Sequence, residues 1–138
     1  MTAAARPPLL GIRHVALFVA DLAVAERFWV DVMGYSVEWR PDADNVYLCA
    51  GSDNLALHSR PAMAALSAED QRLDHIGLAV AAPAQVDAWA THLATHAVAV
   101  EAAPRTHRDG SRSLYFRASD GSPMGPLVQI IYHRPLSE

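Results

Sequence analysis

The chain has 138 residues, of which 51% are hydrophobic and 19% are charged, and this size and composition are typical of one globular domain. Its formal net charge of -4 argues against a nucleic-acid partner, and its single cysteine, Cys49, excludes an intrachain disulfide. Because the sequence has no apolar run typical of a membrane span or a signal peptide, we expect a soluble cytoplasmic protein.

The first half of the chain begins with a predicted strand and helix. Residues 12–21 alternate as strands do, and His14 shares a face with the small Ala16. Asp21 is a favourable N-cap, and Gly34 is a natural helix stop. The apolar residues between them recur at helical spacing and are Leu22, Ala25, Trp29 and Val32. The strands predicted after this helix lie at 35–40, 46–50 and 54–59.

The second half repeats this order after a linker at 61–72, in which we expect a short helix at 67–72. The next predicted strand carries His75, which shares its face with the small residues Gly77 and Ala79. Small neighbours leave room beside an imidazole, so both early histidines are candidates for lining a site.

A second helix is predicted to begin at Pro83, a residue that suits the first helical position. Its apolar stripe consists of Val86, Trp89, Ala90 and Leu93. His96 and Ala97 stand where the first half has Gly34, so this helix has the poorer stop. The remaining predicted strands lie at 98–101, 113–117 and 127–133.

The first strands of the two halves align at a spacing of 61 residues, from His14 to His75. The same spacing aligns Leu17 and Val19 with Leu78 and Val80. Both halves read as βαβββ, so we predict an α+β fold made of two tandem βαβββ modules, at 9–60 and 73–134.

Two local motifs accompany this repeat. One is Phe28-Trp29 followed by Met33-Gly34-Tyr35, and the other is the segment 114–121. They are similar to the "FY…LG(F/Y)" helix end and to the "YFxDPDG" hairpin that are typical of one protein superfamily. With these motifs, the chain resembles the vicinal oxygen chelate superfamily, the group of glyoxalases, extradiol dioxygenases and bleomycin- or fosfomycin-resistance proteins. The resemblance implies that the modules form curved mixed sheets around a cavity, which commonly holds a divalent metal.

The resemblance also implies metal ligands on the first and last strands of each module. The first-strand positions are His14 and His75, and the last-strand positions are Ala56 and Gln129. The fourth position usually holds glutamate and alanine has no ligand atom, so the chain departs from the family at both last strands. We expect a site of the two histidines and the glutamine; the alternative is hydrogen-bonded core histidines and a glutamine that touches no metal.

Two imidazoles and an amide oxygen suit Zn, Fe, Ni or Mn. Because all three ligands are neutral, the metal would keep its full charge and hold an anionic, oxygen-bearing substrate as a Lewis acid. The absent carboxylate argues against oxygen activation, and it removes the usual base of a glyoxalase reaction.

Further candidates for the site follow from strand faces and charge. The catalytic candidates are His58 and Tyr115, and the substrate-binding candidates are Tyr47, Arg108 and Arg112. The histidine lies two residues beyond Ala56, so it is a fourth ligand, a general base or an exposed strand-end residue. Either tyrosine could donate into the cavity or pack in the core. The arginines belong to a cationic loop at 105–112, which either recognises a carboxylate or phosphate or is solvated.

We therefore expect one of two functions. One is a metal-dependent enzyme of the glyoxalase or dioxygenase type, acting as an isomerase, lyase or dioxygenase. The other is a metal-free protein that sequesters a small molecule, as bleomycin-resistance-like members do, and the loss of both last-strand carboxylates fits this reading. The resemblance also implies a homodimer.

Overall fold

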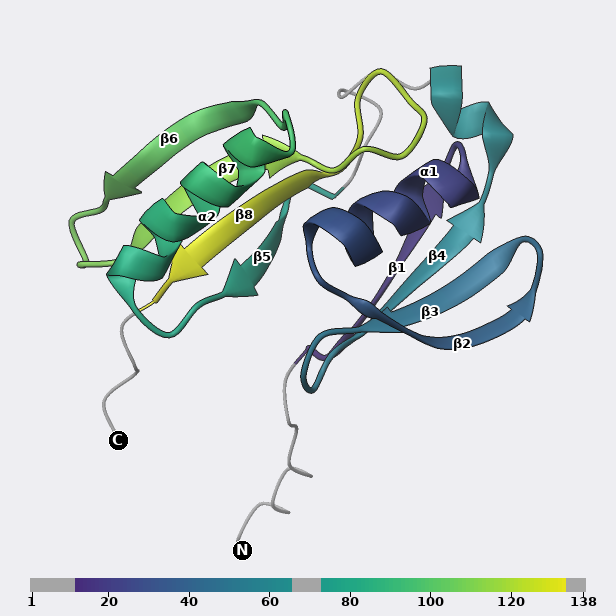
Figure 1. Ribbon diagram of the computed structural model, residues 1–138, viewed down its shortest axis with the longest axis horizontal. Helices are drawn as coiled ribbons and strands as arrows, with labels where there is room; N and C mark the ends of the chain where they lie inside the picture. The colour runs from purple at the N-terminus through teal and green to yellow at the C-terminus, as the bar shows by residue number, and fades with distance from the viewer. Residues whose placement is uncertain (1–11, 66–72, 134–138) are drawn as a thin grey trace, which may run out of the picture.

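The computed structural model describes residues 12–65 and 73–133, which form two four-stranded mixed sheets with helices packed against them (Figure 1). The elements in chain order are β1 (His14–Val19), α1 (Leu22–Arg27), the π-helical turn η1 (Phe28–Val32), β2 (Ser36–Asp42), β3 (Asn45–Cys49), β4 (Asn54–Ser59), the 3₁₀ turn η2 (Pro61–Ala65), β5 (Ile76–Ala79), α2 (Pro83–Thr95), β6 (Val100–Thr106), β7 (Arg112–Arg117) and β8 (Leu127–Tyr132). The predicted α+β class is confirmed. The helix predicted at 67–72 lies outside the described residues.

The same topology occurs twice, with strand orders β1-β4-β3-β2 and β5-β8-β7-β6. In each module the first strand pairs in parallel with the last, which places their side chains next to one another on a common face. Ala16 pairs with Ala56, and Gly77 pairs with Gln129. Ala16 and Gly77 are 61 residues apart whereas Ala56 and Gln129 are 73 apart, so the second module is longer, but both last-strand residues occupy the same place in their ladders.

Each sheet is covered on one face only, and we call the other the open face. Along β1, Leu17 and Val19 are buried, whereas His14, Ala16 and Phe18 are exposed. Residues two apart on a strand point the same way, so the histidine lies on the open face. Among the described residues, no helix is long and apolar enough to cross a membrane.

The covered faces of the two modules share one hydrophobic core. The rings of Phe28 from the first module and Phe116 from the second lie 6.2 Å apart between centroids. His92 on α2 donates from Nε2 to the carbonyl oxygen of Val32, at 2.8 Å. The buried apolar side chains include Trp29, Leu48, Leu57, Leu93, Leu114, Phe116 and Ile130. This common core fixes the modules, and therefore their candidate residues, relative to each other.

The predicted N-cap and the two predicted helix stops all lie at the expected residues. The Asp21 carboxylate accepts a hydrogen bond from the Val24 backbone N–H at 3.1 Å, so the predicted N-cap is confirmed. The first helix changes to the π-helical turn η1 before it stops, and Gly34 then takes a left-handed φ of 82°. Ala97 adopts the corresponding conformation after α2, with a φ of 58°. The poorer predicted stop therefore uses the same geometry with a less suitable residue.

The outer strands depart from the sequence prediction. β6 was expected at 98–101 but continues to Thr106, so Arg105 lies in this strand and Arg112 begins β7. The cationic loop is correspondingly shorter than predicted. Most residues of β6 are exposed, so the antiparallel β6–β7 pairing, rather than burial, extends the strand.

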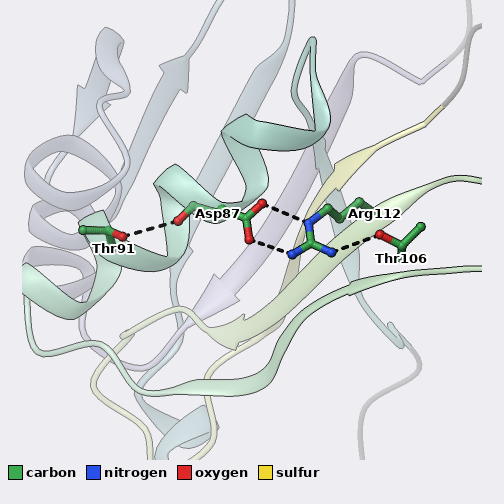
Figure 2. A network of polar contacts seen from close by, with 4 residues as sticks. All are labelled: Asp87, Thr91, Thr106 and Arg112. Atoms are coloured by element: carbon green, nitrogen blue, oxygen red, sulfur yellow. Dashed lines mark hydrogen bonds and ion pairs between the residues drawn. The ribbon is translucent and has the colours of Figure 1, made fainter.

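Arg112 connects the second sheet to its helix (Figure 2). Its Nε and Nη2 donate to the two carboxylate oxygens of Asp87 on α2, at 3.0 and 2.6 Å. Nη1 donates to the Thr106 hydroxyl at 3.0 Å. The guanidinium lowers the pKa of the Asp87 carboxyl, and the same hydrogen bonds raise the pKa of Arg112. A two-pronged arginine–carboxylate pair of this kind holds a fixed orientation.

The first prediction concerns the two helix stops. We expect Ala97→Gly to raise the free energy of unfolding by about 1 kcal/mol, because the left-handed conformation costs an alanine about 1–2 kcal/mol and glycine's greater unfolded-state freedom offsets part of the gain. The reverse change, Gly34→Ala, should lower it, and since an added Cβ meets nothing within 4 Å, the loss reports backbone strain alone. Urea denaturation measures both; destabilisation by Ala97→Gly would contradict the assignment.

The second prediction concerns the pH dependence of the Asp87–Arg112 pair. The folded-state pKa of Asp87 is lowered, so the pair's stabilisation is present above the ordinary aspartate pKa and is lost as pH falls through the folded-state pKa. We expect Arg112→Ala to reduce stability slightly at neutral pH, with the difference from wild type shrinking in acid. NMR titration of the Asp87 carboxyl should show its pKa rising in this variant but not in Arg108→Ala. An unchanged Asp87 pKa in Arg112→Ala would refute the pairing.

Candidate metal and ligand site

The first half of the candidate site is a chain of three polar residues on the open face of the first sheet. His14 Nδ1 lies 2.7 Å from Oδ1 of Asn54, its register partner on β4. Asn54 Nδ2 in turn donates to Glu38 Oε2 at 2.8 Å. The sequence analysis missed Asn54 and Glu38. Asn54 had a usable signal, because it precedes Ala56 by two residues and therefore shares its strand face.

The second half of the site gathers three of the predicted residues. The rings of His75 and Tyr115 pack edge to face, with centroids 5.3 Å apart. The buried Gln129 donates from Nε2 to the Tyr115 hydroxyl at 2.9 Å. A Cβ added at Gly77 would lie 3.4 Å from Gln129 Oε1, so the glycine keeps the space beside this amide oxygen open. The structure therefore places His75, Tyr115 and Gln129 together.

Both histidines are oriented through Nδ1. His75 Nδ1 lies 2.6 Å from a carboxylate oxygen of Asp74, which can only accept a hydrogen bond. In the neutral imidazole Nδ1 therefore carries the hydrogen and Nε2 carries the lone pair. His14 Nδ1 faces an amide oxygen, which has the same consequence. Histidines that bind metals typically donate from the other ring nitrogen to such an oxygen, so both rings have the arrangement of a metal ligand.

A cavity of about 330 Å³ lies between β1 and β5, and His14, Tyr115 and Gln129 are not among the residues that line it. It is lined by residues of both modules, namely Ile12, Arg13, Val15, Trp29, Tyr35, Asp53, Asn54, Leu55, Leu73, His75, Ile76, Gly77 and Leu78. His75 and Asn54, the partner of His14, thus line the same space. Arg13 adds a cationic side chain that the sequence analysis did not select.

The cavity wall is held by a buried hydrogen bond. Tyr35 donates its hydroxyl hydrogen to Asp53 Oδ2 at 2.7 Å, and the Ala50 backbone N–H donates to the other carboxylate oxygen at 2.6 Å. Burial and the hydrogen bond to Asp53 raise the pKa of Tyr35, so this phenol stays protonated at neutral pH. These contacts fix the turn that leads directly into Asn54.

The predicted residues His58 and Tyr47 lie elsewhere on the open face of the first sheet. His58 pairs with Phe18 across β1 and β4, four residues along from the His14–Asn54 pair. At roughly 3.3 Å per residue, about 13 Å separates the two positions. Tyr47 packs edge to face on His58 at 6.1 Å and stacks with Trp39 at 5.3 Å. The structure does not bring this pair to His14.

The two predicted arginines also differ in their surroundings. Arg112 is held against Asp87 on the helix-covered side of the second sheet, the side opposite Tyr115. Arg108 is exposed in the β6–β7 turn. Neither lines the cavity between β1 and β5, where the cation is Arg13.

One chain encloses this site incompletely. The side chain of His75 is 34% exposed and His14 is exposed, so the expected enclosure of both imidazoles is not met within one chain. The reason is that nothing among the described residues covers the open face of the first sheet. No group of three or more His, Cys, Asp or Glu in the described part of the chain is arranged to hold a metal. A three-ligand site therefore needs the amide of Gln129 or residues of a second chain.

Comparisons with known proteins agree with this architecture. A family model described as the Glyoxalase/Bleomycin resistance protein/Dioxygenase superfamily matches residues 11–124. A lactoylglutathione lyase from Agrobacterium tumefaciens is similar in structure with a TM-score of 0.72 and 25% identity, covering 91% of this chain and 96% of that one. A glyoxalase/bleomycin resistance protein/dioxygenase from Alicyclobacillus acidocaldarius has a TM-score of 0.68 and 17% identity, covering 91% and 92%.

An integron cassette protein from the mobile metagenome of the Halifax Harbour sewage outfall also shares the fold, with a TM-score of 0.73 and 18% identity over 91% of this chain and 100% of that one. No curated protein matches the sequence. The family model spans most of the chain, and the similar structures share its fold, so the chain belongs to the glyoxalase/bleomycin resistance protein/dioxygenase superfamily.

Proposed function

We propose that the protein is a divalent-metal-dependent enzyme that acts on a small, oxygen-bearing, anionic substrate. The observation that carries the proposal is the orientation of three side chains. Nδ1 of His14 and of His75 each face an oxygen acceptor, and the amide nitrogen of Gln129 donates to Tyr115. The atoms left over, two Nε2 lone pairs and one amide oxygen, are all metal-binding atoms.

These residues fit a divalent metal of the Zn, Fe, Ni or Mn type. His14, His75 and Gln129 would hold it, and the bound ion would supply Lewis-acid polarisation of a substrate oxygen. Because the three donors are neutral, they leave the positive charge uncompensated. Arg13 and the carboxylate of Asp53 both line the adjoining cavity, so the preference for an anion rests on the charge of the ion.

Tyr115 is the proposed catalytic hydroxyl. Its oxygen accepts from Gln129, which leaves its hydrogen free to donate to a substrate oxygen beside His75. His58 lies about 13 Å along the sheet from His14 and is therefore no longer proposed as the base. The likeness to a lactoylglutathione lyase supports lyase or isomerase chemistry over oxygen activation.

We further propose that the protein works as a homodimer in which a second copy covers the open face of the first sheet. Phe18 and Trp39 on this face are 48% and 60% exposed. They end a row of rings that crosses the sheet through His58 and Tyr47. A row of partly exposed aromatic side chains indicates a contact surface, and identical chains most often pair about a two-fold axis. Such a contact would also enclose His14.

A second candidate function is metal-free sequestration of a small molecule. It is favoured by the stacked Trp39 and Tyr47 and by the cation–π contact of Arg60 with Phe18 at 3.9 Å, a surface suited to a flat organic ligand. Ala56 at the last-strand position also gives the first module no ligand atom beyond His14.

The third prediction tests the metal. Elemental analysis of protein purified without an affinity tag or chelator should find about one divalent metal per site, because two Nε2 lone pairs and one amide oxygen are available. His14→Ala and His75→Ala should each weaken Zn²⁺ binding by more than the roughly 10–100-fold typical of losing a supporting partner. His96→Ala, on the exposed end of the second helix, is the matched control. Metal-free wild type near neutral pH that still binds small molecules would establish sequestration instead.

The fourth prediction tests the assembly. Trp39→Glu should convert a dimer to a monomer in size-exclusion chromatography with light scattering, because burying an unpaired carboxylate in an apolar contact is costly. Ala94→Glu, an equal change on the exposed surface of α2, should leave the dimer intact. Wild-type protein that is monomeric at micromolar concentration would disprove the proposed homodimer.

A further inference from the structure

We propose that Glu38, acting through Asn54, is a positioning residue that keeps the Nε2 lone pair of His14 available to the metal. This inference rests on the proposed function, since it concerns one of the proposed ligands. It adds a carboxylate to a site whose matched family positions hold none, although this carboxylate contacts the ligand's partner and not the metal.

A β-bulge brings Glu38 to the open face. On β2, Val37 pairs with Leu48 and Trp39 pairs with the next residue, Tyr47, so Glu38 is an extra residue at this point of the ladder. Without the extra residue, alternation would direct Trp39 to the covered side. The bulge permits both Glu38 and Trp39 to reach the open face, where one contacts Asn54 and the other stacks on Tyr47.

The chemistry of Glu38 determines which way the Asn54 amide points. An ionised carboxylate only accepts hydrogen bonds, so the amide nitrogen of Asn54 must face Glu38. The amide oxygen must then face His14, and an amide oxygen also only accepts. Nδ1 of His14 therefore carries the hydrogen, and Nε2 carries the lone pair. One negative charge thus selects both the orientation of the amide and the tautomer of the imidazole.

Without that charge, the opposite arrangement is equally well hydrogen-bonded. If the Asn54 amide turned over, its nitrogen would donate to Nδ1 of His14, and the ring hydrogen would move to Nε2. A protonated Nε2 cannot bind a metal. Groups that orient a ligand from behind typically change metal affinity by 10–100-fold when they are altered, so the expected effect is measurable.

The second module has no equivalent of the hydrogen bonds that connect Glu38 through Asn54 to His14. Its bulge on β6 carries Glu101, but this carboxylate accepts from Arg117 Nε at 3.0 Å. The position equivalent to Asn54 is Leu127, which has no polar atom, and His75 is oriented by the neighbouring Asp74 instead. Glu101 is therefore a matched control, since it is the same residue at the same bulge without the link to a histidine.

The test is the tautomer of His14 in metal-free protein, observed by two-bond ¹H–¹⁵N correlation of the ring nitrogens at an alkaline pH where imidazoles are neutral. Wild type should carry the hydrogen on Nδ1. Glu38→Gln should give a mixture, because glutamine can either donate to or accept from Asn54. The double variant Glu38→Gln with Asn54→Asp should restore the wild-type tautomer, because aspartate offers His14 an acceptor in every orientation. Glu101→Gln should change nothing.

Titration with Zn²⁺ alone gives the second readout. Glu38→Gln should bind about 10-fold more weakly than wild type and than Glu101→Gln, and the double variant should recover most of the loss. An Nε2-protonated His14 in wild type, or an unchanged tautomer in Glu38→Gln, would overturn the inference. If wild type shows the expected tautomer but takes up no Zn²⁺, the proposed metal function fails, and with it the role of Glu38 at a metal.

Discussion

Each sheet packs against helices on one face only, and the candidate residues on the open faces depend on this one-sided burial. A strand whose inner residues are as buried as Leu17 and Val19 must direct its alternate residues outward, and His14 is one of these. A shift of one residue in the register would exchange the two sets and bury the imidazole under the helices. The core that stabilises the fold therefore also determines which side chains can meet a ligand.

The duplicated scaffold carries unlike polar groups in its two copies. Both first strands present a histidine with Nδ1 bound to an oxygen, but the oxygen comes from Asn54 in one module and from Asp74 in the other. The second module also places the amide of Gln129 and the hydroxyl of Tyr115 near its histidine. This asymmetry suits a site in which one module contributes a single oriented ligand and the other contributes a histidine, an amide and a hydroxyl.

The sequence was sufficient for the features that depend on periodicity. The repeat of His14 at His75 predicted the module order. The resemblance to the superfamily, supported by strand alternation at Gln129, predicted the last-strand positions, and Ala56 and Gln129 do lie at equivalent places of the parallel ladders. The N-cap at Asp21 followed from residue type alone, because its carboxylate satisfies a free backbone N–H.

Features that depend on an inserted residue or on contacts between distant elements could not be predicted from periodicity. The bulge at Glu38 breaks the period of two, so alternation gives no sign that Glu38 and Trp39 reach one face. Arg112 pairs with Asp87, which lies 25 residues earlier on another element. From the sequence, the charge of Arg112 suggested only that this residue binds an anionic ligand. Arg13 was overlooked because lining a cavity depends on how the two modules pack, which no local pattern records.

The proposed function requires that His14 and His75 bind one ligand, within a protomer or across a dimer. The most direct measurement is a crystal structure of Zn²⁺-loaded protein with an anomalous difference map recorded at the zinc absorption edge. The account predicts a peak bonded to Nε2 of both histidines and to the amide oxygen of Gln129. A zinc peak bound to neither histidine, or the two imidazoles holding separate ions in every assembly, would contradict it.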